Sequence, residues 1–120
     1  MNCEKFLELV SCKLGTVVKA TKFGGLIEKV AVVSGAGGSF LNAAAAFGAQ
    51  AFVTGECKHS DFVEACCKNL CLVAAGHFET ENLICEVLAG QLSTQFTDVN
   101  FFVAQNCRPA HYFTGDLKWL

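Results

Sequence analysis

The sequence lacks the features that mark several large classes of protein. Its 120 residues contain one proline, one tryptophan and one tyrosine, and only 17% of them are charged. The nine lysines and arginines form no run and the formal net charge is −2, so there is no basic footprint of the kind that neutralises nucleic-acid phosphates. No apolar run reaches the roughly 18 residues of a membrane-spanning helix. These absences argue against nucleic-acid and membrane partners.

Two signals that bear on the cysteines are also missing. There is no CxxC pair, which argues against a zinc ribbon or a thioredoxin-type motif. The start at Met1 is not followed by the apolar stretch of a signal peptide, which argues against a secreted disulfide framework. The eight cysteines are Cys3, Cys12, Cys57, Cys66, Cys67, Cys71, Cys85 and Cys107. Most of them lie in apolar segments, where a thiol behaves as a small hydrophobic group. We therefore expect reduced thiols and a cytoplasmic location.

What the chain does have is an excess of apolar residues. Hydrophobic residues make up 52% of the sequence, and the mean hydropathy is +0.41. Two explanations remain open at this point. Either a central sheet is buried on both faces, or apolar surface is covered by another subunit, as in a homo-oligomer.

Strand-like and helix-like segments alternate along the chain. Helices are expected at 2–14, 40–48, 62–68 and 82–96, with Ser39 as an N-cap, and strands at 16–20, 28–33, 51–54, 70–74 and 100–104. The strand at 28–33 ends in the continuous apolar run Val30–Val33, which is typical of a central strand. This alternation predicts an α/β fold: a single three-layer domain with a mostly parallel sheet and helices on both faces. The expected domain covers 1–120, with a lead-in helix and strand at 1–28 and a docking tail at 105–120.

The predicted topology gathers polar side chains at one edge of the sheet. Right-handed crossovers bring the carboxyl ends of parallel strands together, so the loops after Val33, Thr54 and Ala74 should share an edge. The metal-competent residues on the last two of these loops are Glu56, His59, Asp61, His77 and Glu81. A site at this edge is therefore expected.

His77 and Glu81 form the strongest candidate pair. A histidine at the exit of a buried strand and a carboxylate four residues later can present two ligands on one side of a strand–helix junction. Imidazole and carboxylate together suit zinc, iron or manganese. The alternative is structural, with His77 hydrogen-bonded in a loop and Glu81 stabilising a helix N-terminus.

The glycine loop Gly35–Ser39 is a second candidate. Backbone N–H groups of Gly35, Gly37, Gly38 and Ser39 can bind an anionic group of a ligand. The loop is neither a Walker A motif nor a GxGxxG dinucleotide motif. A tight strand-to-helix turn that needs glycine backbone angles also explains the loop and is the favoured interpretation.

The loop between 55 and 61 supplies further candidates. Glu56, His59 and Asp61 can complete a metal's coordination, act as a general base or orient the ligands. In the alternative interpretation, Ser60 or Asp61 caps the following helix and His59 is simply solvated.

Three stretches resemble a known family in order and spacing. They are VAVVSGAGGS at Val30–Ser39, AFVTGECKHSD at Ala51–Asp61 and GHFETE at Gly76–Glu81. Together they resemble the C-terminal half of the Nif-three-like family, the dinuclear-metal-centre hexameric proteins often described as homologues of a type-two GTP cyclohydrolase I. The resemblance extends over roughly 29–104.

The resemblance implies a Nif-three-like half-fold and a divalent-metal centre. In the family, the residues matching His77 and Glu81 are ligands of a two-metal centre, and the glycine loop and the 54–61 stretch form the rim of the same cleft. For Glu56 and His59 the resemblance implies proximity to this centre. The hypothesis that follows is a metal-dependent hydrolase acting on a nucleotide or phosphate-bearing substrate, with Glu56 or His59 as the proton-transfer candidate.

The chain departs from the family pattern in one respect. Family members are longer, and their N-terminal half supplies a His-His pair and an aspartate that this sequence lacks. Three outcomes are consistent with this: a separate N-terminal-half chain supplies the missing ligands, local residues replace them, or the site has degenerated. In the last case the chain is a non-catalytic oligomerisation or protein-interaction module.

Overall fold

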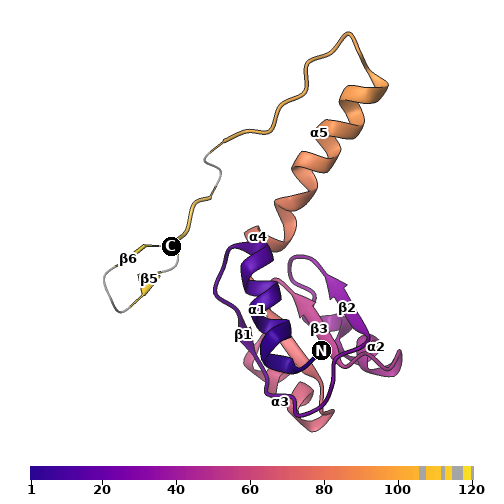
Figure 1. The fold of residues 1–120 in the computed structure, drawn as a ribbon, viewed down its shortest axis with the longest axis vertical. Helices are drawn as coiled ribbons and strands as arrows, with labels where there is room; N and C mark the ends of the chain where they lie inside the picture. The colour runs from indigo at the N-terminus through magenta and orange to yellow at the C-terminus, as the bar shows by residue number, and fades with distance from the viewer. Residues whose placement is uncertain (106–107, 112, 115–117, 120) are drawn as a thin grey trace. The chain divides into compact units, whose positions relative to one another are not determined.

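The computed structural model describes residues 1–105, 108–111, 113–114 and 118–119. Contacts divide the chain into two compact units, Met1–Glu81 and Asn82–Leu120 (Figure 1). The first unit contains a four-stranded sheet with helices, and the second contains a long helix and a two-stranded sheet. The predicted single domain over 1–120 stays a prediction. None of the helices within the described ranges combines the length and apolar character needed to cross a bilayer.

The first helix, α1 (Cys3–Leu14), has well-defined ends. The side chain of Asn2 accepts a hydrogen bond from the backbone N–H of Lys5 at 3.0 Å, which satisfies one of the unpaired donors of the first turn. Gly15 follows the last helical residue, where the predicted helix at 2–14 also ends. Its φ is 61°, and glycine adopts this left-handed conformation without strain. Phe6 is the buried residue of α1.

The sheet has the order β1-β4-β3-β2. Its strands are β1 (Lys19–Ala20), β2 (Val30–Val33), β3 (Ala51–Thr54) and β4 (Cys71–Ala74). Strands β2, β3 and β4 are parallel, and β1 pairs antiparallel with β4. The mostly parallel sheet confirms the predicted fold class.

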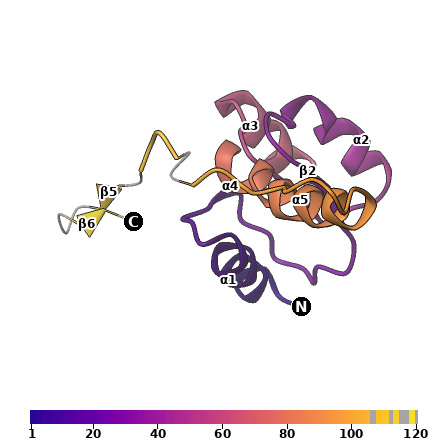
Figure 2. The ribbon, with the colours of Figure 1, turned by 90° about the horizontal axis from the view of Figure 1, so that it is seen from above.

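Alternate residues of the central strands point to opposite faces and build two cores. Val53 and Val73 pack with Phe6 on the α1 side, whereas Phe52 and Leu72 pack on the side of α2 (Leu41–Ala46) and α3 (His59–Cys67). Figure 2 shows α1 on the opposite side of the sheet from α2 and α3. Every residue of β3 is buried, because both faces of this strand are covered.

The position predicted for the strand at 28–33 is wrong. Strand β2 lies at the edge of the described sheet, and the side chains of Val30 and Val32 are 38% and 68% exposed. Ala31 and Val33 are half-buried, so exposure alternates along the strand, because only one face of β2 is covered within this unit. An apolar run alone does not distinguish a central strand from an edge strand that leaves apolar surface exposed.

Two helix starts also differ from prediction. Ser39 lies inside a short 3₁₀ helix, η1 (Gly38–Phe40), so it is not the N-cap of α2. Helix α3 begins at His59 instead of residue 62, because the Asp61 carboxylate accepts a hydrogen bond from the Lys58 N–H at 2.7 Å. That bond satisfies a backbone donor where the chain enters the helix.

The second unit contains α5 (Leu83–Gln95), close to the predicted helix at 82–96, and the antiparallel pair β5 (Phe113–Thr114) and β6 (Lys118–Trp119). The predicted strand at 100–104 is wrong, since these residues, all of them described, form no strand. Instead the ring centroid of Phe101 lies 6.3 Å from that of Phe96. The predicted docking tail at 105–120 lies partly outside the described residues.

Candidate functional site

The loops that follow the three parallel strands meet at one edge of the sheet, as predicted. The carbonyl oxygen of Gly35, after β2, accepts a hydrogen bond from the N–H of Gly55, after β3, at 2.8 Å. The carbonyl oxygen of Gly55 in turn accepts one from the N–H of Gly76, after β4, at 3.0 Å. The sheet's hydrogen-bond pattern thus continues past the strands and fixes the three loops against one another.

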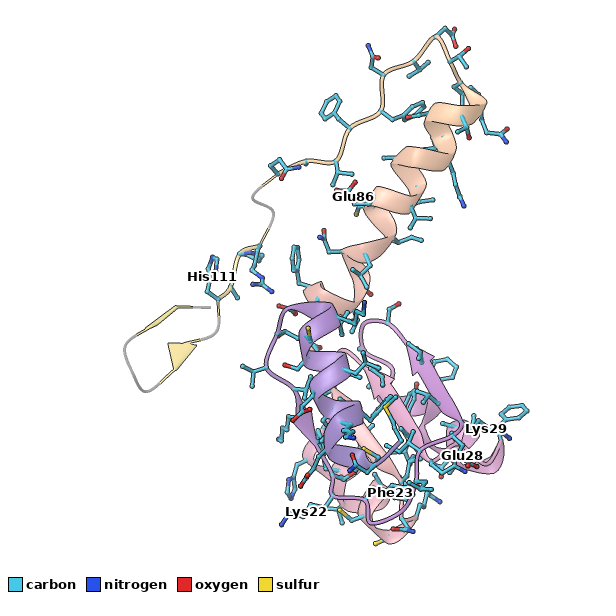
Figure 3. All side chains as sticks on the ribbon, viewed as in Figure 1. Lys22, Phe23, Glu28, Lys29, Glu86 and His111 are labelled. Atoms are coloured by element: carbon cyan, nitrogen blue, oxygen red, sulfur yellow. The ribbon has the colours of Figure 1, made fainter. Side chains whose placement is uncertain are left out.

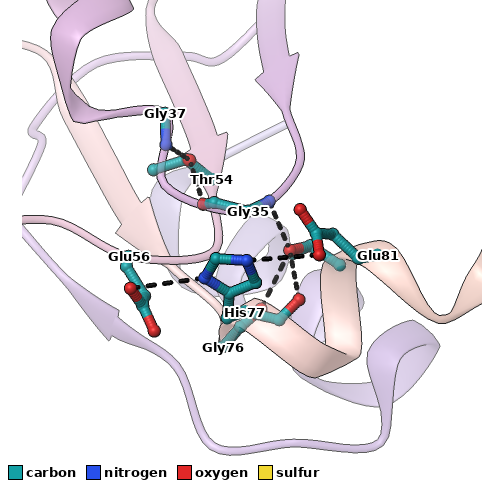
Figure 4. Close-up of polar contacts among 8 residues, drawn as sticks. Gly35, Gly37, Thr54, Glu56, Gly76, His77 and Glu81 are labelled. Atoms are coloured by element: carbon teal, nitrogen blue, oxygen red, sulfur yellow. Dashed lines mark hydrogen bonds and ion pairs between the residues drawn. The ribbon is translucent and has the colours of Figure 1, made fainter.

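His77 lies between two carboxylates at this edge (Figure 4). It is the first residue of the short helix α4 (His77–Glu81). Its Nε2 lies 3.2 Å from Oε2 of Glu81, one helical turn later, and its Nδ1 lies 3.3 Å from Oε2 of Glu56. The ring is 43% exposed, so both ring nitrogens are engaged while the imidazole remains open to solvent.

The two carboxylates favour the charged form of the histidine. The hydrogen bond to Glu56 is the largest cause that raises the pKa of His77 above its ordinary value, and both negative charges act in the same direction. Desolvation opposes them and lowers the pKa by a smaller amount. A protonated His77 therefore forms an ion pair with both neighbours, whereas a neutral one can donate from Nδ1 and leave Nε2 as an acceptor.

Gly35 leaves the space that this arrangement needs. Its φ is +64°, and a Cβ atom built on it would overlap the Glu81 carboxylate and lie 3.2 Å from Nε2 of His77. Gly55 is equally confined, since a Cβ there would lie 2.7 Å from the carbonyl oxygen of Gly35. The glycines are thus required by the close approach of the loops to the site.

Two threonine hydroxyls hold the glycine loop in place. Thr80, on α4 between His77 and Glu81, accepts a hydrogen bond from the N–H of Gly35 at 3.0 Å. Thr54, the last residue of β3, accepts one from the N–H of Gly37 at 2.9 Å and donates to the carbonyl oxygen of Gly35 at 3.0 Å. Sequence reasoning missed both threonines. Their signal is a hydroxyl residue at a strand end and another between two candidate ligands.

The same bonds bear on anion binding by the loop. The N–H groups of Gly35 and Gly37 already donate to hydroxyl oxygens within the protein. A Cβ on Gly38 would lie 2.5 Å from Oδ2 of Asp61, so this glycine allows the loop to pack on α3. This geometry favours the tight-turn interpretation, while ligand binding by Gly35, Gly37, Gly38 and Ser39 stays a prediction.

A hollow of about 420 Å³ lies beside the glycine loop. It is lined by Ala36, Gly38, Ser39, Glu56, Cys57, Lys58 and Asp61. Burial raises the pKa of the Cys57 thiol to about 11, so this cysteine is a neutral wall residue and not a nucleophile. Glu56 lines this hollow and also contacts His77, so it belongs to both sites.

The predicted residues are only partly brought together. Glu56 and Glu81 contact His77, whereas His59 is an exposed residue at the start of α3 and is not one of the two ion-pair partners of His77. Asp61 accepts the hydrogen bond that stabilises the start of α3, and its carboxylate packs against Gly38. The proton-transfer role predicted for Glu56 or His59 stays a prediction.

The donor set fits part of a metal centre. Two donors bound to one ion at about 2.1 Å lie roughly 3.0–3.4 Å apart. The 3.2 Å between Nε2 of His77 and Oε2 of Glu81 falls in this range, and Gly35 leaves the space beside them clear. Within the described residues, however, no three His, Cys, Asp or Glu side chains are grouped to hold an ion. Glu56 contacts the other ring nitrogen of His77, Nδ1, where it would orient the imidazole.

A comparison with protein families decides the affiliation of the chain. The model of the Duf34/NIF3 (NGG1p interacting factor 3) family matches residues 1–109. The chain belongs to this family.

Individual NIF3-family relatives agree with this. The chain is 40% identical over 67 residues to a protein of Nostoc sp. and 37% identical over 87 residues to one of Pyrococcus horikoshii, both named GTP cyclohydrolase 1 type 2 homolog. These matches cover 56% and 72% of this chain. The solved structure of Staphylococcus aureus protein SA1388 superposes with a TM-score of 0.83 and 26% identity over 94% of this chain.

The chain spans only a minor part of these relatives. The matches cover 26% of the Nostoc protein, 34% of the Pyrococcus protein and 39% of the Staphylococcus chain. Most of the polypeptide of each relative therefore lies outside the matched region.

Proposed function

We propose that this chain provides half of a divalent-metal centre, with His77 and Glu81 as ligands. The observation that carries the proposal is the 3.2 Å separation of Nε2 of His77 and Oε2 of Glu81, beside a glycine that leaves the adjoining space clear. Zinc, iron and manganese suit this donor pair. A bound divalent ion would polarise a bond to be hydrolysed and lower the pKa of a coordinated water.

The residues around the ligands have distinct roles in the proposal. Glu56 accepts a hydrogen bond from Nδ1 of His77, which directs Nε2 toward the ion and fixes the tautomer. Thr80 ties the glycine loop to α4, so it keeps the ligands in register. Glu56 and the exposed His59 are the candidates for moving a proton to or from a substrate.

The remaining ligands would come from outside the described residues. A catalytic metal site normally has at least three protein ligands, and the described part of this chain groups fewer than three. The chain covers 26% to 39% of the three relatives, so most of their polypeptide has no counterpart in it. A separate N-terminal-half chain or a second copy is the proposed source of the ligands that complete a centre of one or two ions.

Metal titration tests the half-site. We expect the purified chain to bind zinc or manganese, and His77→Ala and Glu81→Gln each to weaken binding at least about tenfold. His111→Ala is the matched control, since His111 is another exposed histidine. Wild-type protein that takes up no more metal than the His77→Ala variant would overturn the proposal.

The proposed reaction class is hydrolysis of a nucleotide or another phosphate-bearing substrate. The hollow of about 420 Å³ offers the Lys58 ammonium and the Ser39 hydroxyl beside the His77 site. Inorganic phosphate and GTP should each raise the melting temperature of the metal-loaded protein, and Lys58→Gln should reduce that shift. No shift with either compound would exclude this substrate class.

A second candidate function is self-association through α5, a non-catalytic interaction role. None of the residues of α5 is buried, and Leu83, Ile84 and Val87 are each more than 50% exposed. Glu86 is the one charged residue of this helix (Figure 3). A 13-residue helix alone in water is only marginally stable. The exposed apolar surface of α5 therefore favours a covering partner, and we propose a second copy of this chain.

Light scattering during size-exclusion chromatography tests this candidate. We expect a dimer or larger oligomer that Leu88→Glu dissociates and Gln91→Glu leaves intact, because both residues are exposed on α5 but only Leu88 is apolar. A wild-type monomer at all concentrations would exclude self-association and direct attention to a separate N-terminal-half chain.

A further inference from the structure

Two cysteine sulfurs from distant parts of the sequence lie in contact. Sγ of Cys3, in the first turn of α1, is 3.5 Å from Sγ of Cys71, the first residue of β4. Both belong to the core between α1 and the sheet, where Cys71 is completely buried and Cys3 packs partly exposed against it. This pair lies on the opposite face of the sheet from Cys57, which packs with α2 and α3.

The two sulfurs lie at non-bonded contact distance. A disulfide bond is about 2.05 Å long, so the two sulfurs need to approach by about 1.5 Å. Rotation of two side chains covers part of that distance, and α1 can supply the rest. Its contacts with the sheet come from one buried residue, Phe6, and a few partly buried ones.

The two thiols differ in their access to solvent. Cys3 is partly exposed, so a small oxidant can reach it. Cys71 has no exposed surface, and burial together with the Cys3 thiol raises its pKa to about 12. Cys3 is therefore the entry point, and Cys71 reacts only with a sulfur already placed beside it.

We propose that Cys3 and Cys71 form an oxidative modification site that closes to a disulfide with a small-molecule disulfide such as oxidised glutathione. Cys3 loses its proton and attacks one sulfur of the small disulfide, whose S–S bond breaks and releases one thiol. Cys71 then loses its proton and attacks Sγ of Cys3, releasing the second thiol. The protein pair loses two electrons and two protons, and the small disulfide is reduced to two thiols.

The bond would fix α1 to the sheet. It joins residues 68 positions apart in the sequence, so it removes much conformational freedom from the unfolded chain. The backbone nitrogen of Met1 donates to the carbonyl oxygen of Ile27 at 2.9 Å, which also holds the start of α1. Oxidation would thus add a covalent bond to this hydrogen bond at the start of α1.

Peptide mapping of the full chain tests the proposal. Purified reduced protein is incubated with oxidised glutathione, its free thiols are alkylated, and it is digested with trypsin and a glutamate-specific protease. Cleavage after Lys68 and Glu79 separates Cys71 from Cys85 and Cys107. We expect a peptide containing Cys3 linked to the peptide 69–79. Cys12, an exposed cysteine of the same helix, should carry glutathione without a link.

Variants distinguish closure from random oxidation. In Cys3→Ser, the buried Cys71 should stay reduced and should react with the alkylating reagent only after the protein is denatured. In Cys71→Ala, glutathione should remain bonded to Cys3. In wild-type protein and in the control Cys12→Ser, oxidation should raise the melting temperature by about 5 °C or more, and in Cys3→Ser it should not. The proposal fails if glutathione stays on Cys3 of folded wild-type protein, or if the link forms without changing the melting temperature.

Discussion

Nε2 of His77 lies 3.2 Å from Oε2 of Glu81, and the two residues are one turn apart on the five-residue helix α4. Because only Ala75 and Gly76 separate β4 from α4, the end of the strand fixes where the helix points. The pair is therefore positioned by the sheet, and Glu56 from the neighbouring loop sets the orientation of the ring.

Replacing Gly35 should be unusually costly. Gly15→Ala tests the backbone conformation alone, since Gly15 has a φ of +61° with open space around it. This variant should lose about 1 kcal/mol of unfolding free energy. Gly35→Ala adds a Cβ that overlaps the Glu81 carboxylate and should cost at least about 2 kcal/mol. Urea unfolding measures both. Equal costs would show that the space beside Glu81 is not constrained.

The charge state of His77 should make stability depend on pH. Its folded pKa lies above the ordinary value of 6.5, so the folded state binds the proton more tightly than the unfolded chain. The resulting stabilisation is fully present below pH 6.5 and is lost as the pH rises through the folded pKa. Glu56→Gln should lower the pKa more than Glu81→Gln, because the hydrogen bond to Glu56 is the largest cause.

Histidine NMR titration of the metal-free protein checks this prediction. A His77 pKa at or below 6.5 would contradict it. The same proton competes with metal, so metal affinity should fall as the pH is lowered through the raised pKa.

Removing the Thr80 hydroxyl should loosen the glycine loop. Thr80→Val deprives the Gly35 N–H of its acceptor and the Gly76 carbonyl oxygen of a donor at 2.9 Å. We expect a loss of about 1–2 kcal/mol of unfolding free energy, while Thr80→Ser, which keeps the hydroxyl, should lose less than half of that. Denaturant unfolding measures both variants, and a loss in Thr80→Ser as large as that in Thr80→Val would mean that the hydroxyl contributes no more than the methyl group.

Two phenylalanines should differ sharply in their importance for stability. Phe52 on β3 is fully buried and Phe47, just after α2, is 79% exposed. Phe52→Ala should cost about 3–5 kcal/mol and Phe47→Ala about 0.5 kcal/mol or less. Thermal and urea unfolding provide the measurement. A large cost for Phe47→Ala would indicate that this ring is covered by another chain in solution.

The sequence alone determined the three parallel strands of the sheet and where the loops after them converge. Alternating strands and helices predict a parallel sheet, and parallel strands put their carboxyl ends on one edge, so Gly35, Gly55 and Gly76 had to meet. Local patterns also predicted the end of α1 at Gly15 and the strand Ala51–Thr54. Backbone geometry and side-chain periodicity are sufficient for these features.

Only the tertiary structure decided how the site is built and which strand lies at the edge. The contact between His77 and Glu56 joins two loops, and no spacing in the sequence specifies it. The exposure of Val32 and the contact between Cys3 and Cys71 likewise depend on where α1 lies over the sheet. An apolar side chain or a thiol has the same local signature wherever it packs, and long-range packing alone gives it neighbours.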